Sequence, residues 1–177
     1  MDLFEAIERR HCYRGAFSPQ RVKREDLTQA LRAGLMAPSG KNAQTTQFVI
    51  IDDPQLLGKI GSMHTMKAMH TAAAMIACIV DIHPEATYEG FSFSVEDCSA
   101  AAENILLALT GLGYAAVWID GWLRLQNRAQ VIGDLLGLPA GKGVRVLLPV
   151  GVPAEPVTAP SKKPFEQRVW FNRYGGA

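Results

Sequence analysis

The sequence predicts an α+β domain in which a few buried strands lie between helices on both faces. The chain has 177 residues, 48% of them hydrophobic and 20% charged, which is enough for one domain with a sizeable core. Short apolar runs of strand length alternate with amphipathic segments of helix length. Residues 94–114 are rich in small side chains and become apolar nearly all round, which is typical of a helix at the centre of a core or an interface.

The N-terminal third predicts two helices, a loop and a strand. Residues 3–10 and 23–37 carry apolar side chains at helical spacing. These side chains are Leu3, Phe4 and Ile7 in the first segment and Leu27, Ala30, Leu31 and Leu35 in the second. Pro38 ends the second helix. A polar loop follows, then a strand over residues 47–53 and a short helix from Pro54, with Asp53 as its N-cap.

The remainder of the domain alternates strands and helices. Residues 72–82, 115–120 and 144–152 read as strands, because they are short apolar runs. Residues 94–114 and 126–137 read as helices, and the first of these is expected to end at Gly111 or Gly113.

Residues 153–177 predict an extended arm instead of a packed helix, because four prolines fall within the first fifteen positions. The arm is expected to end in a short strand or hook at residues 168–171 (RVWF). It carries Trp170, Phe171 and Tyr174, whose rings need a place to be buried. The partner subunit of a dimer is one such place.

Composition argues against several classes of protein. The net charge of +1 and the pI of about 7.8 create no broad field that would attract nucleic acid or a membrane surface. Cys12, Cys78 and Cys98 show no CxxC spacing, so neither a zinc site nor a disulfide framework is expected. His64 and His70 do not share a helical face, and no metal site is predicted. The apolar runs are too short to span a bilayer. Because no disulfide framework is expected, we expect a protein of the reducing cytoplasm.

Three short stretches are candidates for function. Residues 9–17 (RRHCYRGAF) concentrate positive charge in a balanced chain, which suits a small anion; a solvated basic helix end is the alternative. Residues 37–44 (APSGKNAQ) contain a helix-ending turn that explains Pro38 and Gly40 but leaves Asn42 and Gln44 unexplained. Residues 118–122 (WIDGW) are either a plain strand-end turn or a binding loop. The sequence has no GxGxxG and no Walker loop.

In this order, these stretches resemble the nitroreductase family of FMN-dependent oxidoreductases. The family usually opens with an Arg-Arg-Ser-x-Arg or Arg-His-Ser-x-Lys element after its first helix. It continues with an Ala-Pro-Ser-x-x-Asn-x-Gln-Pro-Trp loop before a strand. The central helix, the strand that follows it, the last strand and the basic tail of this chain also resemble those of the family. The resemblance covers nearly the whole chain.

The resemblance implies a three-layer α+β sandwich with a mainly antiparallel central sheet flanked by helices. It implies a single domain over residues 1–177, with residues 153–177 as a C-terminal arm swapped onto the partner subunit of a homodimer. It also implies two FMN sites at the dimer interface, with NAD(P)H as co-substrate.

The resemblance assigns cofactor-binding residues. These are Arg10, His11, Cys12 and Arg14 against the phosphate, ribityl chain and ring, Asp120 and Gly121 beside flavin N5, and Lys162 and Lys163 at the phosphate. Pro38 and Ser39 would approach the flavin from the other subunit, Asn42 would hydrogen-bond the ribityl chain or the ring edge, and Gln44 would lie nearby. A backbone N–H of the Asp120–Gly121 loop would reach N5, and Gly121 would permit close approach. No side chain is assigned as a catalytic acid or base.

The chain departs from the family pattern at three places. Cys12 stands where serine is usual, and a thiol is a weak donor to phosphate. Thr45 and Thr46 replace the Pro-Trp pair, and Phe17 falls one residue later than the family's aromatic residue.

The predicted function is transfer of hydride from NAD(P)H through flavin N5 to a nitroaromatic, a quinone or a similar small acceptor, with the flavin supplying the redox chemistry. Three alternatives stay open. One is a flavin-binding protein without turnover, in storage or sensing. Another is a different reductive flavin chemistry on the same scaffold, and the third is a structural dimer without cofactor.

Overall fold

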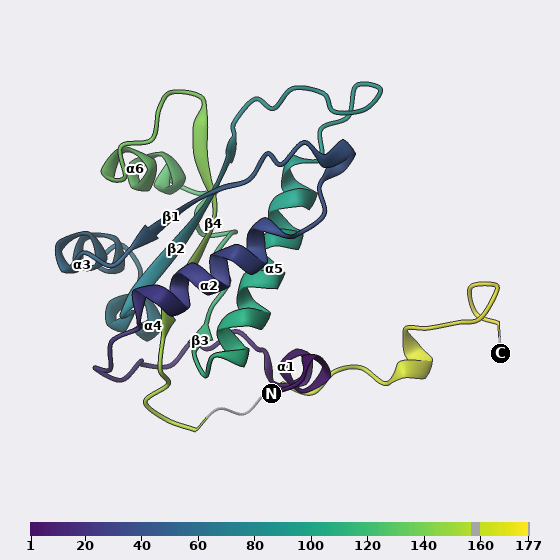
Figure 1. Cartoon of the computed structure of the whole chain (residues 1–177), viewed down its shortest axis with the longest axis horizontal. Coiled ribbons are helices and arrows are strands. Elements are labelled where there is room, and N and C mark those ends of the chain that lie inside the picture. The colour runs from purple at the N-terminus through teal and green to yellow at the C-terminus, as the bar shows by residue number, and fades with distance from the viewer. Residues whose placement is uncertain (157–159, 177) are drawn as a thin grey trace.

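A four-stranded antiparallel sheet lies between two layers of helices in the computed structural model, which describes residues 1–156 and 160–176 (Figure 1). The strand order is β1-β2-β4-β3. The strands are β1 (Gln47–Ile51), β2 (Ala74–Asp81), β3 (Ala115–Ala116) and β4 (Lys142–Gly151). The helices are α1 (Leu3–Arg9), α2 (Arg24–Leu35), α3 (Pro54–Gly61), α4 (Lys67–Thr71), α5 (Ser94–Gly111) and α6 (Arg128–Leu135). The predicted α+β class with helices on both faces is confirmed.

The strands divide the core into two layers, because successive side chains point to opposite faces of a sheet. On β2, Ile76 and Cys78 face α2 and α5, whereas Met75 and Ala77 face the layer that contains α3, α4 and α6. All four of these side chains are completely buried. β2 and β4 are therefore central strands covered on both sides, as their continuous apolar sequences require.

β4 contains a bulge at its centre. Cys78 pairs with Val146 and the next residue, Ile79, pairs with Val144, so that Arg145 has no partner position on β2. A bulge re-aims a side chain and is common beside functional sites. Here it directs Arg145 to the loop that follows β3, where it pairs with Asp120.

α2 and α5 pack closely because one helix presents a glycine. A Cβ atom at Gly34 would lie 2.7 Å from Ile105 Cγ1 and 3.3 Å from the Ala101 carbonyl oxygen. Asn104 fixes the same pair by donating from its side-chain amide to the Ala33 carbonyl over 3.1 Å. α5 therefore lies directly against α2, and its N-terminal turn faces the loop that follows α2.

Two elements differ from the sequence-based expectation. The strand predicted over residues 115–120 is regular only at β3, and then continues as one bridge between Ile119 and Leu147. Pro149 of β4 accepts from the Val117 N–H over 3.2 Å but has no N–H to donate in return, which interrupts the ladder. α4 was not predicted at all, whereas α3 begins as expected, with Asp53 accepting from the Leu56 N–H at 2.9 Å.

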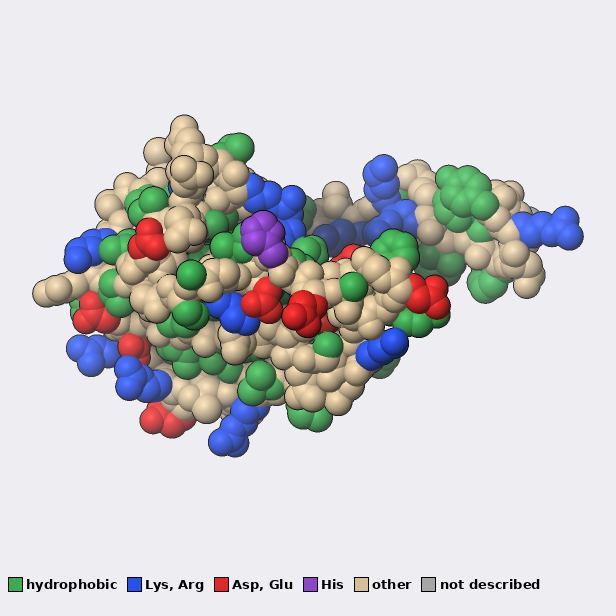
Figure 2. Space-filling model, turned by 90° about the horizontal axis from the view of Figure 1, so that it is seen from above, with side chains coloured by type: hydrophobic (Ala, Val, Ile, Leu, Met, Phe, Trp, Pro, Cys, Tyr) green, Lys and Arg blue, Asp and Glu red, His purple; other side chains and the backbone are tan. Residues whose placement is uncertain are grey.

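The two ends of the chain expose apolar side chains. Leu3, Phe4 and Ile7, expected on one apolar face of α1, are 63%, 76% and 48% exposed, and only Ala6 of that helix is buried. Residues 168–171 form no strand; a single 3-10 turn, Phe165–Gln167, precedes them. Figures 1 and 2 show the arm projecting from the body of the domain with hydrophobic and basic side chains on its surface.

Candidate functional site

The segment that follows α1 runs along the free edge of β3. Cys12 pairs with Ala116 in parallel orientation, and the Tyr13 N–H donates to the Ala116 carbonyl at 3.0 Å. Arg10 is mostly buried, and its Nε lies 3.1 Å from Glu103 Oε1 of α5. Arg14 is exposed and makes no ion pair with the described acidic side chains. The segment therefore offers one anchored and one free guanidinium group.

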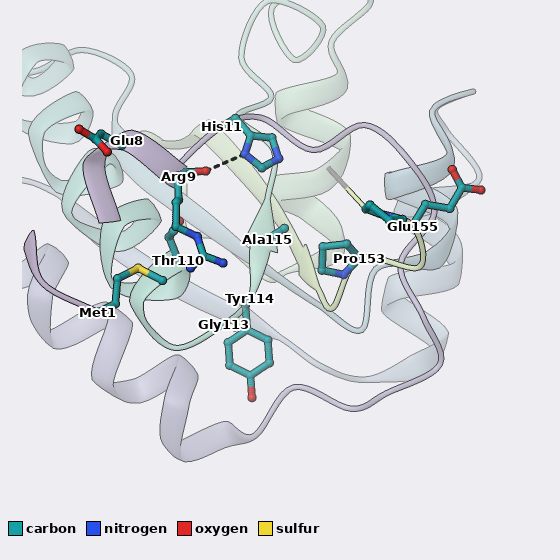
Figure 3. A pocket seen from close by; sticks show the side chains of 11 residues that line it. Met1, Glu8, Arg9, His11, Thr110, Gly113, Tyr114, Ala115, Pro153 and Glu155 are labelled. Carbon is teal, nitrogen blue, oxygen red and sulfur yellow. Dashed lines mark hydrogen bonds between the residues drawn. The ribbon is translucent and has the colours of Figure 1, made fainter. Parts of the chain in front are cut away.

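Within this segment, His11 lines a cavity of about 460 Å³ (Figure 3). Its Nδ1 is 2.8 Å from the Arg9 carbonyl oxygen, so Nδ1 carries the proton of that hydrogen bond and Nε2 is the free nitrogen. Nε2 is buried and has no hydrogen-bond partner among the described residues. The cavity is also lined by residues of α1, the end of α5 and the start of the arm, including Glu8, Thr110, Pro153 and Glu155.

The loop between α2 and β1 holds the second predicted group. Pro38, Ser39 and Gln44 line a separate cavity of about 230 Å³, and Asn42 is exposed. Thr46, which stands in place of the family's tryptophan, also lines this cavity; its hydroxyl is buried without a partner among the described residues. The loop is tied to α5 by Asp97, which sequence reasoning did not single out.

Asp120 is held by two arginines. Arg124 donates two hydrogen bonds of 2.7 Å to its carboxylate, and Arg145 donates a third. Burial raises the pKa of Asp120, but the hydrogen bonds and charges of Arg124 and Arg145 outweigh burial and hold the pKa below its usual value. Gly121 is exposed, and an added Cβ would meet nothing within 4 Å. The fold of this chain therefore does not itself require glycine at that position.

Contacts among three side chains support the loop after Asp120. Trp122 contacts both His64 and Arg128: the Trp122 and His64 ring centroids are 4.8 Å apart with the planes tilted by 44°, and the Arg128 guanidinium carbon is 4.8 Å from the indole centroid. Arg128 also donates to the Trp122 carbonyl at 3.1 Å. Burial, the charge of Arg128 and His70 together lower the pKa of His64. This group was not predicted, and a tryptophan beside a candidate binding loop was the available signal.

The predicted site residues fall into separate groups within one chain. Arg10, His11, Cys12 and Arg14 lie along β3, whereas Pro38, Ser39, Asn42 and Gln44 lie in the loop at the N-terminal turn of α5. Lys162 and Lys163 are exposed on the projecting arm. The chain alone does not bring these three groups together in one cavity among those described.

Two searches of the described residues gave negative results. Within residues 1–156 and 160–176, no helix has both the length and the apolar content needed to cross a membrane. The same part of the chain contains no cluster of three or more His, Cys, Asp and Glu side chains that could hold a metal ion.

Comparison with known proteins identifies relatives over most of the chain. The model of the Nitroreductase family matches residues 7–69 and 60–152. A curated Archaeoglobus fulgidus protein named "Putative NADH dehydrogenase/NAD(P)H nitroreductase" is 32% identical over 141 residues, covering 78% of this chain and 79% of the relative. A crystal structure of a Bacteroides thetaiotaomicron protein of the same name superposes with a TM-score of 0.82 at 29% identity, covering 97% and 98% of the two chains.

One further solved structure contains a cofactor. A Desulfovibrio desulfuricans protein in complex with FMN has a TM-score of 0.78 and 25% identity, and the match covers 98% of each chain.

Proposed function

Because the chain belongs to the nitroreductase family, we propose that it is an FMN-dependent oxidoreductase that uses NAD(P)H to reduce a small acceptor, such as a nitroaromatic or a quinone. The observation that carries this proposal is the pair of unpartnered polar groups on the segment along β3, namely the exposed guanidinium of Arg14 and the buried Nε2 of His11. Bound FMN would supply the redox chemistry that links oxidation of the nicotinamide to reduction of the acceptor.

The groups along β3 suit an anion that also carries hydroxyl groups. The guanidinium of Arg14 is free, that of Arg10 is mostly buried, and both match phosphate oxygens geometrically. In neutral His11, the buried Nε2 is a lone-pair acceptor and would take a hydrogen bond from a ribityl hydroxyl. Cys12 contributes its backbone, because its pairing with Ala116 fixes the main chain there.

The functional unit in this proposal is a homodimer, with Pro38, Ser39, Asn42 and Gln44 reaching the flavin held by the other copy. Three features support it. The site residues form separate groups within one chain, α1 exposes apolar side chains, and the arm exposes Phe165, Phe171 and Tyr174. Crossing of the arm onto the partner would bury these rings and bring Lys162 and Lys163 to the phosphate.

No side chain of this chain acts as an acid or base in the proposed reaction. Asp120 stays ionised, because Arg124 and Arg145 hold its pKa low, and its role is to fix the loop from which a backbone N–H would reach N5. The residues therefore bind, orient and neutralise charge, while the cofactor supplies the redox chemistry.

The test is an absorbance spectrum of the purified, desalted protein, repeated under anaerobic conditions with NADH or NADPH. Oxidised-flavin bands, release of about one FMN per chain, and bleaching by the nicotinamide are expected. Bands that persist would support a flavin-binding protein without turnover. A colourless protein that also fails to take up added FMN would refute the proposal.

Two substitutions locate the site. Arg10→Met and Arg14→Met should each weaken FMN binding, because a phosphate contact is lost. Arg32→Met is the matched control, since Arg32 is exposed on α2 and lines neither the cavity at His11 nor the cavity at Pro38. This variant should bind FMN as the unmodified chain does. Equal affinity in all three variants would contradict the assignment of the β3 segment.

A further inference from the structure

The loop over residues 38–45 has a backbone that ordinary residues avoid. Lys41, Asn42 and Gln44 all have positive φ angles, of 48°, 56° and 50°. Residues with a Cβ atom avoid this left-handed region, and of these three residues asparagine tolerates it best. Local hydrogen bonds hold part of the turn: the Asn42 and Gln44 N–H groups donate to the Ser39 carbonyl and to Ser39 Oγ, at 2.9 and 3.0 Å. A strained loop keeps one shape only where its surroundings determine it.

Asp97 supplies that constraint from α5. Its Oδ1 accepts from the Gly40 N–H at 2.9 Å and its Oδ2 accepts from the Thr45 hydroxyl at 3.2 Å. The three residues with positive φ lie between these two attachment points. One carboxylate therefore holds both ends of the strained segment.

The carboxylate is itself fixed in place. Asp97 is only 6% exposed and lies in the first turn of α5, where the helix dipole favours negative charge. No described Lys or Arg lies within ion-pair distance of it. The buried carboxylate is therefore satisfied by its hydrogen bonds to the loop. Breaking these hydrogen bonds would leave a buried polar group without a partner, which costs free energy.

We propose that Asp97 is a positioning residue that preforms the 38–45 loop for the flavin bound by the partner subunit. This inference rests on the proposed function. If a loop adopts its binding conformation for only a fraction of the time, the apparent Kd for the ligand equals the intrinsic Kd divided by that fraction. Asp97 therefore acts on FMN affinity through Gly40 and Thr45 and has no part in hydride transfer.

The first test measures the loop without FMN. In hydrogen exchange of the apo protein, Asp97→Ala should increase exchange at the Asn42 and Gln44 amides about tenfold or more, because both attachments are lost. Thr45→Val removes one attachment and should give a smaller increase, whereas Thr45→Ser keeps the hydroxyl and should restore protection. Unchanged exchange in Asp97→Ala would overturn the proposal, whether or not the protein binds FMN.

The second test measures FMN affinity by quenching of flavin fluorescence. Asp97→Ala should raise Kd about tenfold or more, Thr45→Val should raise it less, and Thr45→Ser should match the unmodified chain. The kcat at saturating FMN should change little. A lower thermal midpoint with unchanged Kd would reduce Asp97 to a structural role and overturn the proposal. Failure of the unmodified chain to bind FMN would instead refute the proposed function.

A mixed dimer tests action across the subunit boundary. When an Arg10→Met chain pairs with an Asp97→Ala chain, one site receives both defects and the other site receives neither. One tight FMN site per mixed dimer is then expected. If the loop acted within its own chain, each site would carry one defect and no tight site would form. That result would refute the proposal that the loop acts on the flavin bound by the partner subunit.

Discussion

The contact between α2 and α5 at Gly34 predicts a substitution effect opposite to that expected from helix propensity. Alanine in place of glycine within a helix gains up to about 1 kcal/mol. In this structure the new methyl group would lie 2.7 and 2.8 Å from Cγ1 and Cδ1 of Ile105, whereas carbon atoms pack best at about 3.5–4.0 Å. Overpacking of this kind costs about 1–3 kcal/mol. We therefore expect Gly34→Ala to destabilise the protein by about 1 kcal/mol net.

A double-mutant cycle with Ile105 isolates the cause. Ile105→Ala alone should cost about 3 kcal/mol, because it leaves a cavity in the core. In that background Gly34→Ala should stabilise by about 1 kcal/mol, since propensity remains and the methyl group fills vacated space. The coupling energy is then about 2 kcal/mol.

The assay is urea unfolding at one fixed protomer concentration, because the apparent stability of a self-associating protein depends on its concentration. The reasoning is refuted if Gly34→Ala has the same effect in both backgrounds. It is also refuted if Gly34→Ala stabilises the unmodified chain.

Three other predictions concern the fold around the site. Burial and the charge of Arg128 lower the pKa of His64 in the folded protein, so on acidification the imidazole is protonated at a higher pH in the unfolded state than in the folded state. The free energy of unfolding should therefore fall as the pH drops below about 6.5. Urea unfolding at pH 7.5 and 5.5 should show a smaller fall in His64→Gln. Gly61→Ala should lower the thermal midpoint, because its Cβ would lie 2.6 Å from a backbone carbonyl oxygen of α4 that cannot rotate away. Arg145→Met should cost about 1–3 kcal/mol in urea unfolding, since it leaves a partly buried carboxylate short of a partner, whereas Arg124→Met, with a side chain that is 59% exposed, should cost less; equal costs would contradict the burial argument.

The sequence predicted the elements that are long and that carry a regular pattern of apolar side chains facing the core. β2 and α5 are long and strongly patterned, so they were recognised nearly to their ends. The five-residue α4 was missed because a single helical turn carries too few positions for a period to show. β3 was overestimated because the interruption arises from Pro149, which lies on a different strand.

The candidate site was predicted in part. The resemblance supplied residues such as Arg10 and Asn42, which no periodicity would single out. Asp97 had a local signal that was overlooked, since Asp97, Ala101 and Ile105 follow one another at intervals of four along one face of α5. A carboxylate on a buried face predicts a buried polar partner. Arg145 gave a similar signal, as a charge within an otherwise apolar strand.

The bulge at Arg145 determines which single residue can be deleted from β4 without changing the fold. Val144 and Val146 are two positions apart but belong to different layers of the core, because the unpaired residue between them reverses the alternation. Deleting Arg145 would leave every remaining pair with β2 intact and each side chain in its present layer. Deleting any single residue from 146 to 150 would instead place Arg145 at a buried position of the ladder or move neighbouring side chains to the opposite face of the sheet. The fold therefore tolerates a shorter β4 only when the deleted residue is Arg145. Arg145 is also the residue that holds Asp120.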